Sequence, residues 1–150
     1  MLVKTKTGLQ EKLIALRENG GTVGLVPTMG ALHKGHLSLV ERAVAENQTV
    51  VVTIFVNPTQ FNDPSDLKRY PRNLDADINM LANSGCSIVF APDTNEIYPE
   101  PDKRTFDFGN LDKVMEGKHR KGHFNGVAQV VSILFDLVKP ERAYFGQKDA

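Results

Sequence analysis

The sequence predicts an α/β protein in which helices cover both faces of a parallel sheet. Strand-like and helix-like segments alternate along the chain, and residues 49–56 form a continuous run of mainly β-branched side chains. Such a run is typical of a strand buried on both faces, as in a parallel sheet. Alternating strands and helices favour right-handed crossovers between parallel neighbours, which gives a doubly wound arrangement with flanking helices.

Apolar spacing predicts four helices, at residues 7–18, 32–47, 74–84 and 125–139. In the first, Leu9 and Leu13 share a face, and Thr7 and Gln10 have the spacing of a capping box. The last helix ends before Pro140, because proline lacks the amide hydrogen that a helix needs.

Short apolar runs predict the strands, at residues 23–27, 49–56, 87–91 and 142–145. Residues 28–30 are expected to form a turn and residues 57–70 a loop. Residues 92–122 are expected to be irregular, apart from a strand at 105–108 and a helical turn near 111–116. Ligands of doubly wound sheets bind beyond the carboxyl ends of the strands, so the informative loops follow Val26, Val56, Phe90 and Phe145.

Composition limits the classes of protein. The 150 residues fit one domain, and 18 basic residues balance 18 acidic ones, which argues against a broad nucleic-acid-binding surface but leaves a local basic patch open. Cys86 is the only cysteine, so no internal disulfide forms and a cytoplasmic location is expected. No apolar run has the length of a signal peptide or a membrane span. Because the chain stops just after a strand-like segment, we expect a truncated piece of a longer protein.

The segment at residues 27–36, PTMGALHKGH, carries the chemistry. It follows the first core strand and opens a helix, whose first amide groups and dipole favour an anion. Gly30 and Gly35 are expected to let the backbone approach a ligand closely. His33 and His36 are three residues apart and are expected to share a helix face. This set of donors suits a triphosphate whose α-phosphorus is under attack.

Other interpretations of the histidine pair are weaker. Two surface histidines at a helix start would explain the spacing, but not the preceding strand, the turn and the glycines. Zinc needs further ligands, and no Cys or further His pair near residues 33–36 supplies them. The glycine spacing matches neither the P-loop nor the dinucleotide-binding fingerprint.

The segment His33-Lys34-Gly35-His36 resembles the His-x-Gly-His signature of the nucleotidylyltransferase and class I aminoacyl-tRNA synthetase superfamily. The longer string at 27–36 resembles the pantoate–β-alanine ligase family in particular. Further strings of that family recur in order: residues 54–61 (IFVNPTQF), 70–72 (YPR), 122–127 (GHFNGV) and 145–149 (FGQKD). The resemblance implies a Rossmann-like doubly wound parallel sheet with flanking helices.

The resemblance also implies a two-step reaction. Pantoate attacks the α-phosphate of ATP in the presence of Mg2+, and the amine of β-alanine then captures the pantoyl adenylate. His36, His33 and Lys148 are the implied catalytic residues. The implied ATP-binding residues are Met29, Gly30, Ala31, Leu32, His33, Lys34, Gly35, His36, Gly146, Gln147, Lys148 and Asp149. The implied pantoate and β-alanine residues are Pro27, Thr28, Met29, Asn57, Gln60, Val130 and Val131, although the periodicity of the two valines alone indicates core.

The same resemblance implies that residues 1–150 are the N-terminal nucleotide-binding domain, that a C-terminal lid domain is absent, and that the protein is a homodimer. Gln147 stands where many members have Glu. Two alternatives stay open: another nucleotidylyltransferase with the same histidine motif, or a fragment that binds ATP without turnover. The first would need basic residues for a phosphorylated substrate, whereas the loop at residues 57–61 is neutral. A tRNA-binding protein would need a basic stripe that the sequence lacks.

Overall fold

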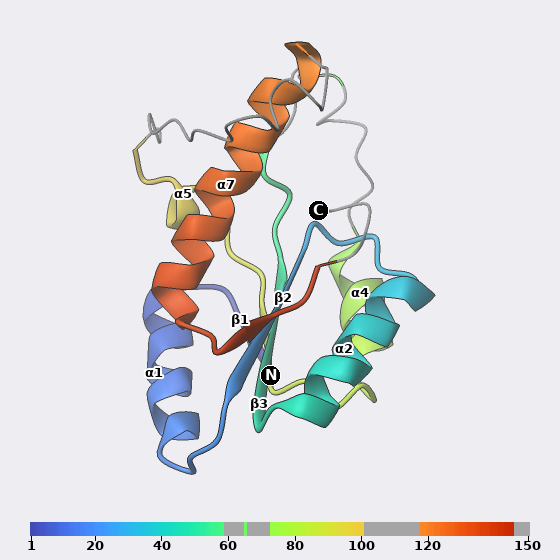
Figure 1. Cartoon of the computed structure of the whole chain (residues 1–150), viewed down its shortest axis with the longest axis vertical. Coiled ribbons are helices and arrows are strands. Elements are labelled where there is room, and N and C mark those ends of the chain that lie inside the picture. The colour runs from blue at the N-terminus through green and yellow to red at the C-terminus, as the bar shows by residue number, and fades with distance from the viewer. Residues whose placement is uncertain (59–64, 66–72, 101–117, 146–150) are drawn as a thin grey trace.

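The computed structural model describes residues 1–58, 65, 73–100 and 118–145, with the backbone alone for 118–125. Helices and strands alternate along most of this part of the chain (Figure 1). Their order is β1 (Leu2–Val3), α1 (Lys6–Arg17), β2 (Val23–Thr28), α2 (Lys34–Glu46), β3 (Thr49–Ile54), α4 (Leu74–Leu81), β4 (Ile88–Phe90), α5 (Thr94–Ile97), α7 (Lys118–Val138) and β5 (Arg142–Ala143).

The five strands form one parallel sheet in the order β1-β4-β3-β2-β5. β2 and β3 pair along their full length, from Val23 with Thr49 to Thr28 with Ile54. From β2 the chain winds through β3 to β4, and it then returns to add β5 on the other side of β2. The winding direction therefore reverses between β2 and β5, and a cleft opens at the carboxyl ends of strands at such a point.

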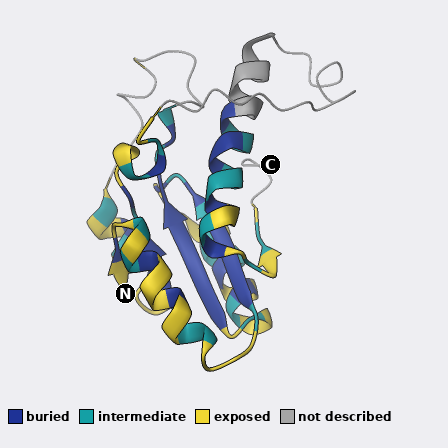
Figure 2. Ribbon diagram, turned by 90° about the vertical axis from the view of Figure 1, so that its left-hand side faces the viewer, coloured by how far each residue is buried: buried dark blue, intermediate teal, exposed yellow. Residues whose placement is uncertain are grey.

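Two apolar layers enclose the sheet, as the expected doubly wound fold requires. One layer packs α1, α5 and α7 against the sheet through residues such as Leu9, Leu13 and Leu134. The other packs α2 and α4 through Val40, Ala43 and Leu81. Figure 2 shows the buried strands between the helices. The prediction of a Rossmann-like α/β fold is confirmed.

Side chains hold the ends of α1 and α7, one of them locally and the other from a distant part of the chain. The Thr5 hydroxyl accepts a hydrogen bond from the Gly8 amide, so α1 is capped by Thr5 and not by Thr7 as the sequence predicted. At the other end of α1, the Arg17 guanidinium donates to the carbonyls of Val138 and Lys139. A cation thus satisfies the last carbonyl groups of α7, which lie at the negative end of its dipole.

A polar cluster joins β5 to the end of α2. The Tyr144 hydroxyl donates to the Glu46 carboxylate and accepts from the Asn47 amide, with distances of 2.5 and 2.9 Å. Arg142 donates to the Glu46 carbonyl and to the Asn47 side chain. Burial, with the hydrogen bond to Glu46, raises the pKa of the Tyr144 phenol above its usual value.

Several element boundaries differ from the prediction. β1 and α5 were not predicted, because two and four residues carry too little periodicity to be recognised. α7 begins at Lys118 and not at 125, so part of the segment predicted to be irregular is helical. α4 ends at Leu81, β3 at Ile54 and β5 at Ala143, each earlier than predicted. The predicted strand at 105–108 and helical turn at 111–116 lie outside the described residues.

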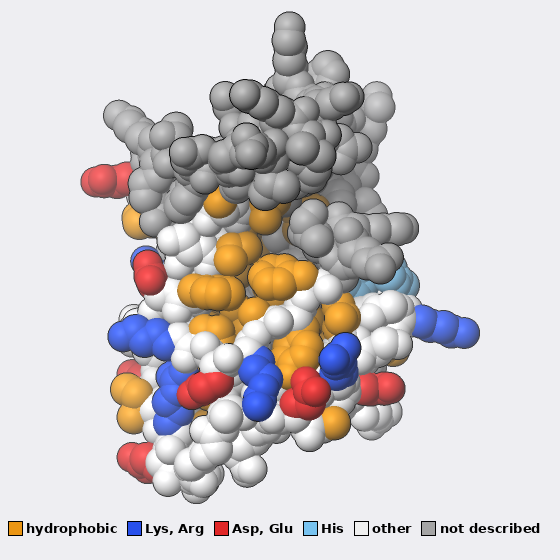
Figure 3. Space-filling view, viewed as in Figure 1, with side chains coloured by type: hydrophobic (Ala, Val, Ile, Leu, Met, Phe, Trp, Pro, Cys, Tyr) orange, Lys and Arg blue, Asp and Glu red, His pale blue; other side chains and the backbone are white. Residues whose placement is uncertain are grey.

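The surface is mixed in character. Hydrophobic side chains gather on the face where α7 and β5 lie, with charged side chains below them (Figure 3). Phe135 and Phe145 are among the exposed aromatic residues. No helix in the part of the chain that the structure describes is both long and apolar enough to cross a membrane.

Candidate functional site

The turn that follows β2 is built on Thr28 and on two residues in the left-handed region. The buried Thr28 hydroxyl donates to the Thr53 carbonyl at 2.8 Å and accepts the Gly30 amide at 3.2 Å. Gly30 has a φ of 87° and Ala31 a φ of 51°. An L-residue at such a φ costs about 1–2 kcal/mol, so surrounding contacts have to hold the turn in place.

A carboxylate from α4 supplies those contacts. Asp77 is buried, with 4% of its surface exposed. Its Oδ2 atom accepts the Ala31 amide at 3.2 Å, and its Oδ1 atom accepts the Leu32 amide at 2.9 Å. Successive amides in turn conformations form a concavity that binds anions, and here a side chain of the same chain fills it.

The two histidines form a reciprocal cap at the start of α2. His33 is the N-cap residue, and its Nδ1 atom accepts the Gly35 amide at 3.0 Å. The His33 amide donates in turn to Nδ1 of His36 at 3.1 Å. The ring centroids lie 4.2 Å apart. A ring nitrogen that accepts a hydrogen bond carries no proton, so each neutral ring carries its proton on Nε2.

This arrangement corrects how the sequence predicted the pair would meet. The helix was expected to begin at Leu32, with both rings on one helix face. It begins at Lys34, so His33 lies outside the helix with a φ of −140°. The rings meet because each side chain caps a backbone amide, not because three residues separate them on a helix.

The structure gives a second reason for glycine at residues 30 and 35. A Cβ atom on Gly30 would lie 3.0 Å from Oδ2 of Asp77, and one on Gly35 would lie 2.8 Å from Cε1 of His33. The absence of a side chain therefore makes room for Asp77 and for the His33 ring. Close approach of a ligand to these two glycines stays a prediction.

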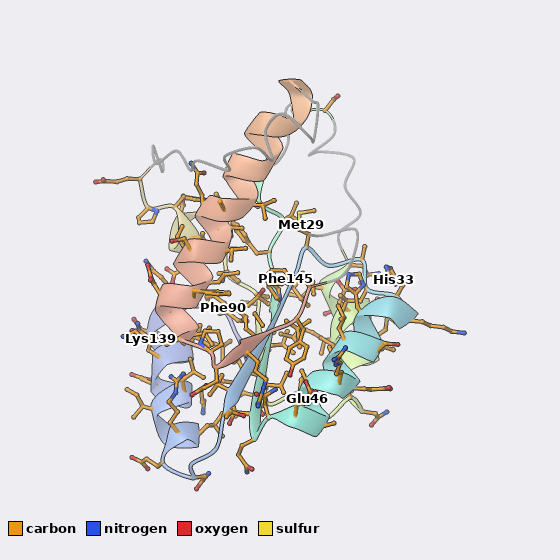
Figure 4. All side chains as sticks on the ribbon, in the orientation of Figure 1. Met29, His33, Glu46, Phe90, Lys139 and Phe145 are labelled. Atoms are coloured by element: carbon orange, nitrogen blue, oxygen red, sulfur yellow. The ribbon has the colours of Figure 1, made fainter. Side chains whose placement is uncertain are left out.

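The expectation of unpaired amides in this segment is wrong for most of it. The amides of Gly30, Ala31, Leu32, His33 and Gly35 all donate to side-chain acceptors. A phosphate group here would thus meet mainly side-chain donors: the imidazoles and the exposed Lys34. Figure 4 shows Met29, His33 and Phe145 around the ends of β2 and β5.

Asn57 joins three segments and is fully buried. Its Nδ2 atom donates to the Gly126 carbonyl at 3.0 Å, and its Oδ1 atom accepts the Tyr98 hydroxyl at 3.1 Å. Both ends of the amide therefore hold α7 and α5 beside the end of β3. A direct contact between Asn57 and a substrate stays a prediction, and the geometry supports a positioning role.

The other predicted substrate residues that the structure describes lie in the sheet, in the core or against it. Val130 is buried in the core layer that includes α7, and Val131 packs against that layer. Pro27 is a half-buried residue of β2. The predicted residues Gln60, Gly146, Gln147, Lys148 and Asp149 lie outside the described residues.

A cavity of about 240 Å³ opens beside the turn, at the carboxyl edge of the sheet. Met29, Gly30 and Asp77 are among its lining residues, and Lys4 and Asp93 contribute charges. Among the residues that the structure describes, no group of three or more His, Cys, Asp or Glu side chains could hold a metal ion. Mg2+ that arrives on ATP needs only one or two carboxylates besides the phosphates.

Asp77 is not among the site residues that the sequence predicts, because a magnesium or phosphate role for Asp75 and Asp77 is doubtful from the sequence alone. It lies three residues after Leu74 and four before Leu81, on the apolar face of α4. A carboxylate on the buried face of a helix needs hydrogen-bond donors, and this signal was available in the sequence. Its partners were not, because they lie more than forty residues earlier.

The fold and the site together define a Rossmann-like α/β domain with a His-x-Gly-His turn at the point where the sheet reverses its winding. Residues 1–150 match the profile of the family described as Pantoate-beta-alanine ligase. The chain therefore belongs to the pantoate–β-alanine ligase family.

Individual relatives agree with this membership. The chain is 64% identical to the pantothenate synthetase of Phocaeicola vulgatus and 60% identical to that of Bacteroides thetaiotaomicron, in each case over 99% of the chain and 52% of the relative. It thus spans about half the length of these curated relatives. A solved pantothenate synthetase from Thermus thermophilus has a TM-score of 0.83 at 49% identity, with 95% of this chain and 50% of that one covered. The Francisella tularensis ligase, complexed with β-γ ATP and β-alanine, has a TM-score of 0.88 at 38% identity, with coverage of 95% and 55%.

Proposed function

We propose that this chain is the N-terminal nucleotide-binding domain of an ATP-dependent ligase that condenses pantoate with β-alanine. Family membership over all 150 residues supports the reaction class. The ATP and β-alanine in the related Francisella tularensis structure support the choice of substrates. The products are pantothenate, AMP and pyrophosphate.

The reaction proceeds in two steps. A carboxylate oxygen of pantoate attacks the α-phosphorus of ATP, and the bond to the bridging oxygen breaks as pyrophosphate leaves. The amine of β-alanine then attacks the acyl carbon of pantoyl adenylate, AMP leaves, and the amine loses a proton. Because the attacking carboxylate is already ionised, the first step needs stabilisation of charge on the phosphate oxygens and no general base.

The histidine pair is the observation that carries this proposal. His33 and His36 use Nδ1 for capping, so their Nε2–H groups are preorganised donors for the phosphates. They follow β2, at the edge where ligands of doubly wound sheets bind. Residues 29–36 and 146–149 are assigned to ATP, with Lys148 as a charge on the phosphates.

The acid pocket is assigned to residues around the ends of β2 and β3. Gln60 offers the donor and acceptor that a hydroxyl beside a carboxylate needs. Pro27, Thr28, Asn57, Val130 and Val131 shape the pocket, and the buried Asn57 does so through Tyr98 and the Gly126 carbonyl. Mg2+ enters with the ATP phosphates, and the protein is a cytoplasmic homodimer.

Mass spectrometry tests the proposal. The complete ligase that contains this chain is mixed with ATP and pantoate but without β-alanine, and we expect pantoyl adenylate and pyrophosphate. His36→Ala should reduce adenylate formation about a hundred- to a thousand-fold, the usual cost of one lost preorganised donor.

Two results would favour the alternatives. Nucleotide transfer to a phosphorylated acceptor, with pantoate inert, would indicate another nucleotidylyltransferase. ATP binding by calorimetry without any adenylate would indicate a binding module. As a control, capture of supplied pantoyl adenylate by β-alanine should suffer less in His36→Ala, because pyrophosphate has already left.

A further inference from the structure

Three consecutive amides link α4 to both histidines. The amides of Ala31 and Leu32 donate to the two oxygens of Asp77, and the next amide, that of His33, donates to Nδ1 of His36. Adjacent peptide planes share a Cα atom, so the orientation of the Leu32 amide limits that of the His33 amide. Whatever fixes the first two amides therefore also limits where the His36 ring is held.

We infer that Asp77 is a positioning residue that sets the geometry of the His33 and His36 donors through the turn at residues 30–32. The inference rests on the proposed function, since it assigns Asp77 to the phosphate site. Asp77 does not act as a ligand for ATP, because it is 4% exposed and both of its carboxylate oxygens accept hydrogen bonds from backbone amides.

The backbone at this turn makes the carboxylate necessary. Ala31 holds a left-handed conformation that an alanine rarely adopts, and it lies at the surface with its amide directed to Asp77. Leu32 is fixed from both sides, by its side chain in the core and by its amide on Asp77. Without the carboxylate, two amides would lose their acceptors and the turn would relax toward ordinary backbone angles.

The best test is Asp77→Asn, which keeps the shape of the side chain. An amide group offers one acceptor oxygen, and its NH2 group would face the second backbone donor. Asp75→Asn is the matched control, because it removes the same charge from the same first turn of α4 at an exposed position. We expect Asp77→Asn to lower the rate of adenylate formation about ten- to a hundred-fold, as small misplacements of reacting groups do. ATP affinity should change less than about three-fold, since the donors are displaced and not removed.

A second readout does not depend on activity. Nitrogen NMR of the 150-residue chain reports which ring nitrogen of each histidine carries the proton, with His119 and His123 as internal references. We expect the wild type and Asp75→Asn to hold His33 and His36 in the Nε2–H form. Asp77→Asn should show a mixture of both tautomers at these two residues. A residue that only stabilised α4 would leave the tautomers unchanged in the folded variant.

The outcomes separate this inference from the proposed function. If Asp77→Asn keeps both the wild-type tautomers and the wild-type rate, the inference is overturned. If the tautomers change but even the wild type makes no adenylate, the positioning role stands and the proposed function fails.

A measurement on the wild type covers the case in which Asp77→Asn does not fold. The amide hydrogens of Ala31 and Leu32 should exchange with solvent as slowly as those inside α2, because a buried carboxylate holds them. Exchange at the rate of an exposed loop would overturn the inference.

Discussion

One ring atom of His33 caps a helix and another has a proposed role in catalysis, and substitution can separate the two. Its Nδ1 atom caps α2 by accepting the Gly35 amide at 3.0 Å, and its Nε2–H group is the proposed phosphate donor. His33→Asn keeps an acceptor at the N-cap position, where asparagine is among the preferred residues, but removes the donor. His33→Ala removes both.

The two variants should differ in stability and agree in activity. Loss of an N-cap costs about 0.5–2 kcal/mol, typically about 1. For a chain of this size, a loss of about 1 kcal/mol lowers Tm by roughly 2–4 °C. His33→Ala should therefore melt about 2–4 °C below the wild type, whereas His33→Asn should melt at the wild-type temperature or slightly above it. Both should adenylate pantoate about a hundred- to a thousand-fold more slowly in the complete ligase.

Calorimetry of the chain and a pyrophosphate-release assay on the complete ligase measure the two quantities. Equal melting temperatures for the two variants would refute the cap. A normal adenylation rate in His33→Asn would refute the role of Nε2–H. The pair of variants thus tests each ring atom separately, which alanine scanning alone does not.

Three further substitutions test other parts of the structure. Gln60→Ala in the complete ligase should weaken pantoate binding about ten- to a hundred-fold, by loss of a hydrogen bond to a charged group, and leave ATP binding nearly unchanged in a titration with each ligand. Gly35→Ala should displace the His33 ring, since the new Cβ would lie 2.8 Å from Cε1, and we expect both a lower Tm and a slower adenylation than in the wild type. Tyr144→Phe should remove a pH-dependent part of the stability, because the pKa of Tyr144 is raised in the folded protein. The protonated phenol stabilises the fold at pH values below its unfolded pKa near 10. This contribution is lost as the pH rises through the folded pKa. Between about pH 8 and pH 11, the Tm should therefore fall less steeply with pH for Tyr144→Phe than for the wild type. Parallel curves of Tm against pH would contradict the raised pKa.

The fold class followed from the sequence because its signals are local. A β-branched run such as residues 49–56 indicates a buried strand wherever it occurs. The spacing of Leu9 and Leu13 likewise indicates the buried face of a helix. β1 could not be predicted in this way. It exists because Leu2 and Val3 pair with Val89 and Phe90, and two residues carry no periodicity of their own.

The motif at residues 27–36 could be found from the sequence, but its internal geometry could not. Histidine is not among the residues usually expected at an N-cap, so the start of α2 was placed at Leu32, before the cap residue His33. The sequence predicts unpaired amides at Ala31 and Leu32, because their acceptor, Asp77, belongs to a different helix. Spacing along the chain indicates which residues meet, whereas hydrogen-bond partners depend on the assembled fold.

The strand order has a consequence for how the chain folds as it is synthesised. β2 and β3 are close in sequence and pair over six residues, so the centre of the sheet can form early. β1 is made first, but its partner β4 emerges much later, and β5 reaches β2 only after α7 is complete. Such long-range pairings close large loops and form slowly. We therefore expect β1 to stay unpaired during synthesis until β4 has been made, while β2 and β3 pair earlier.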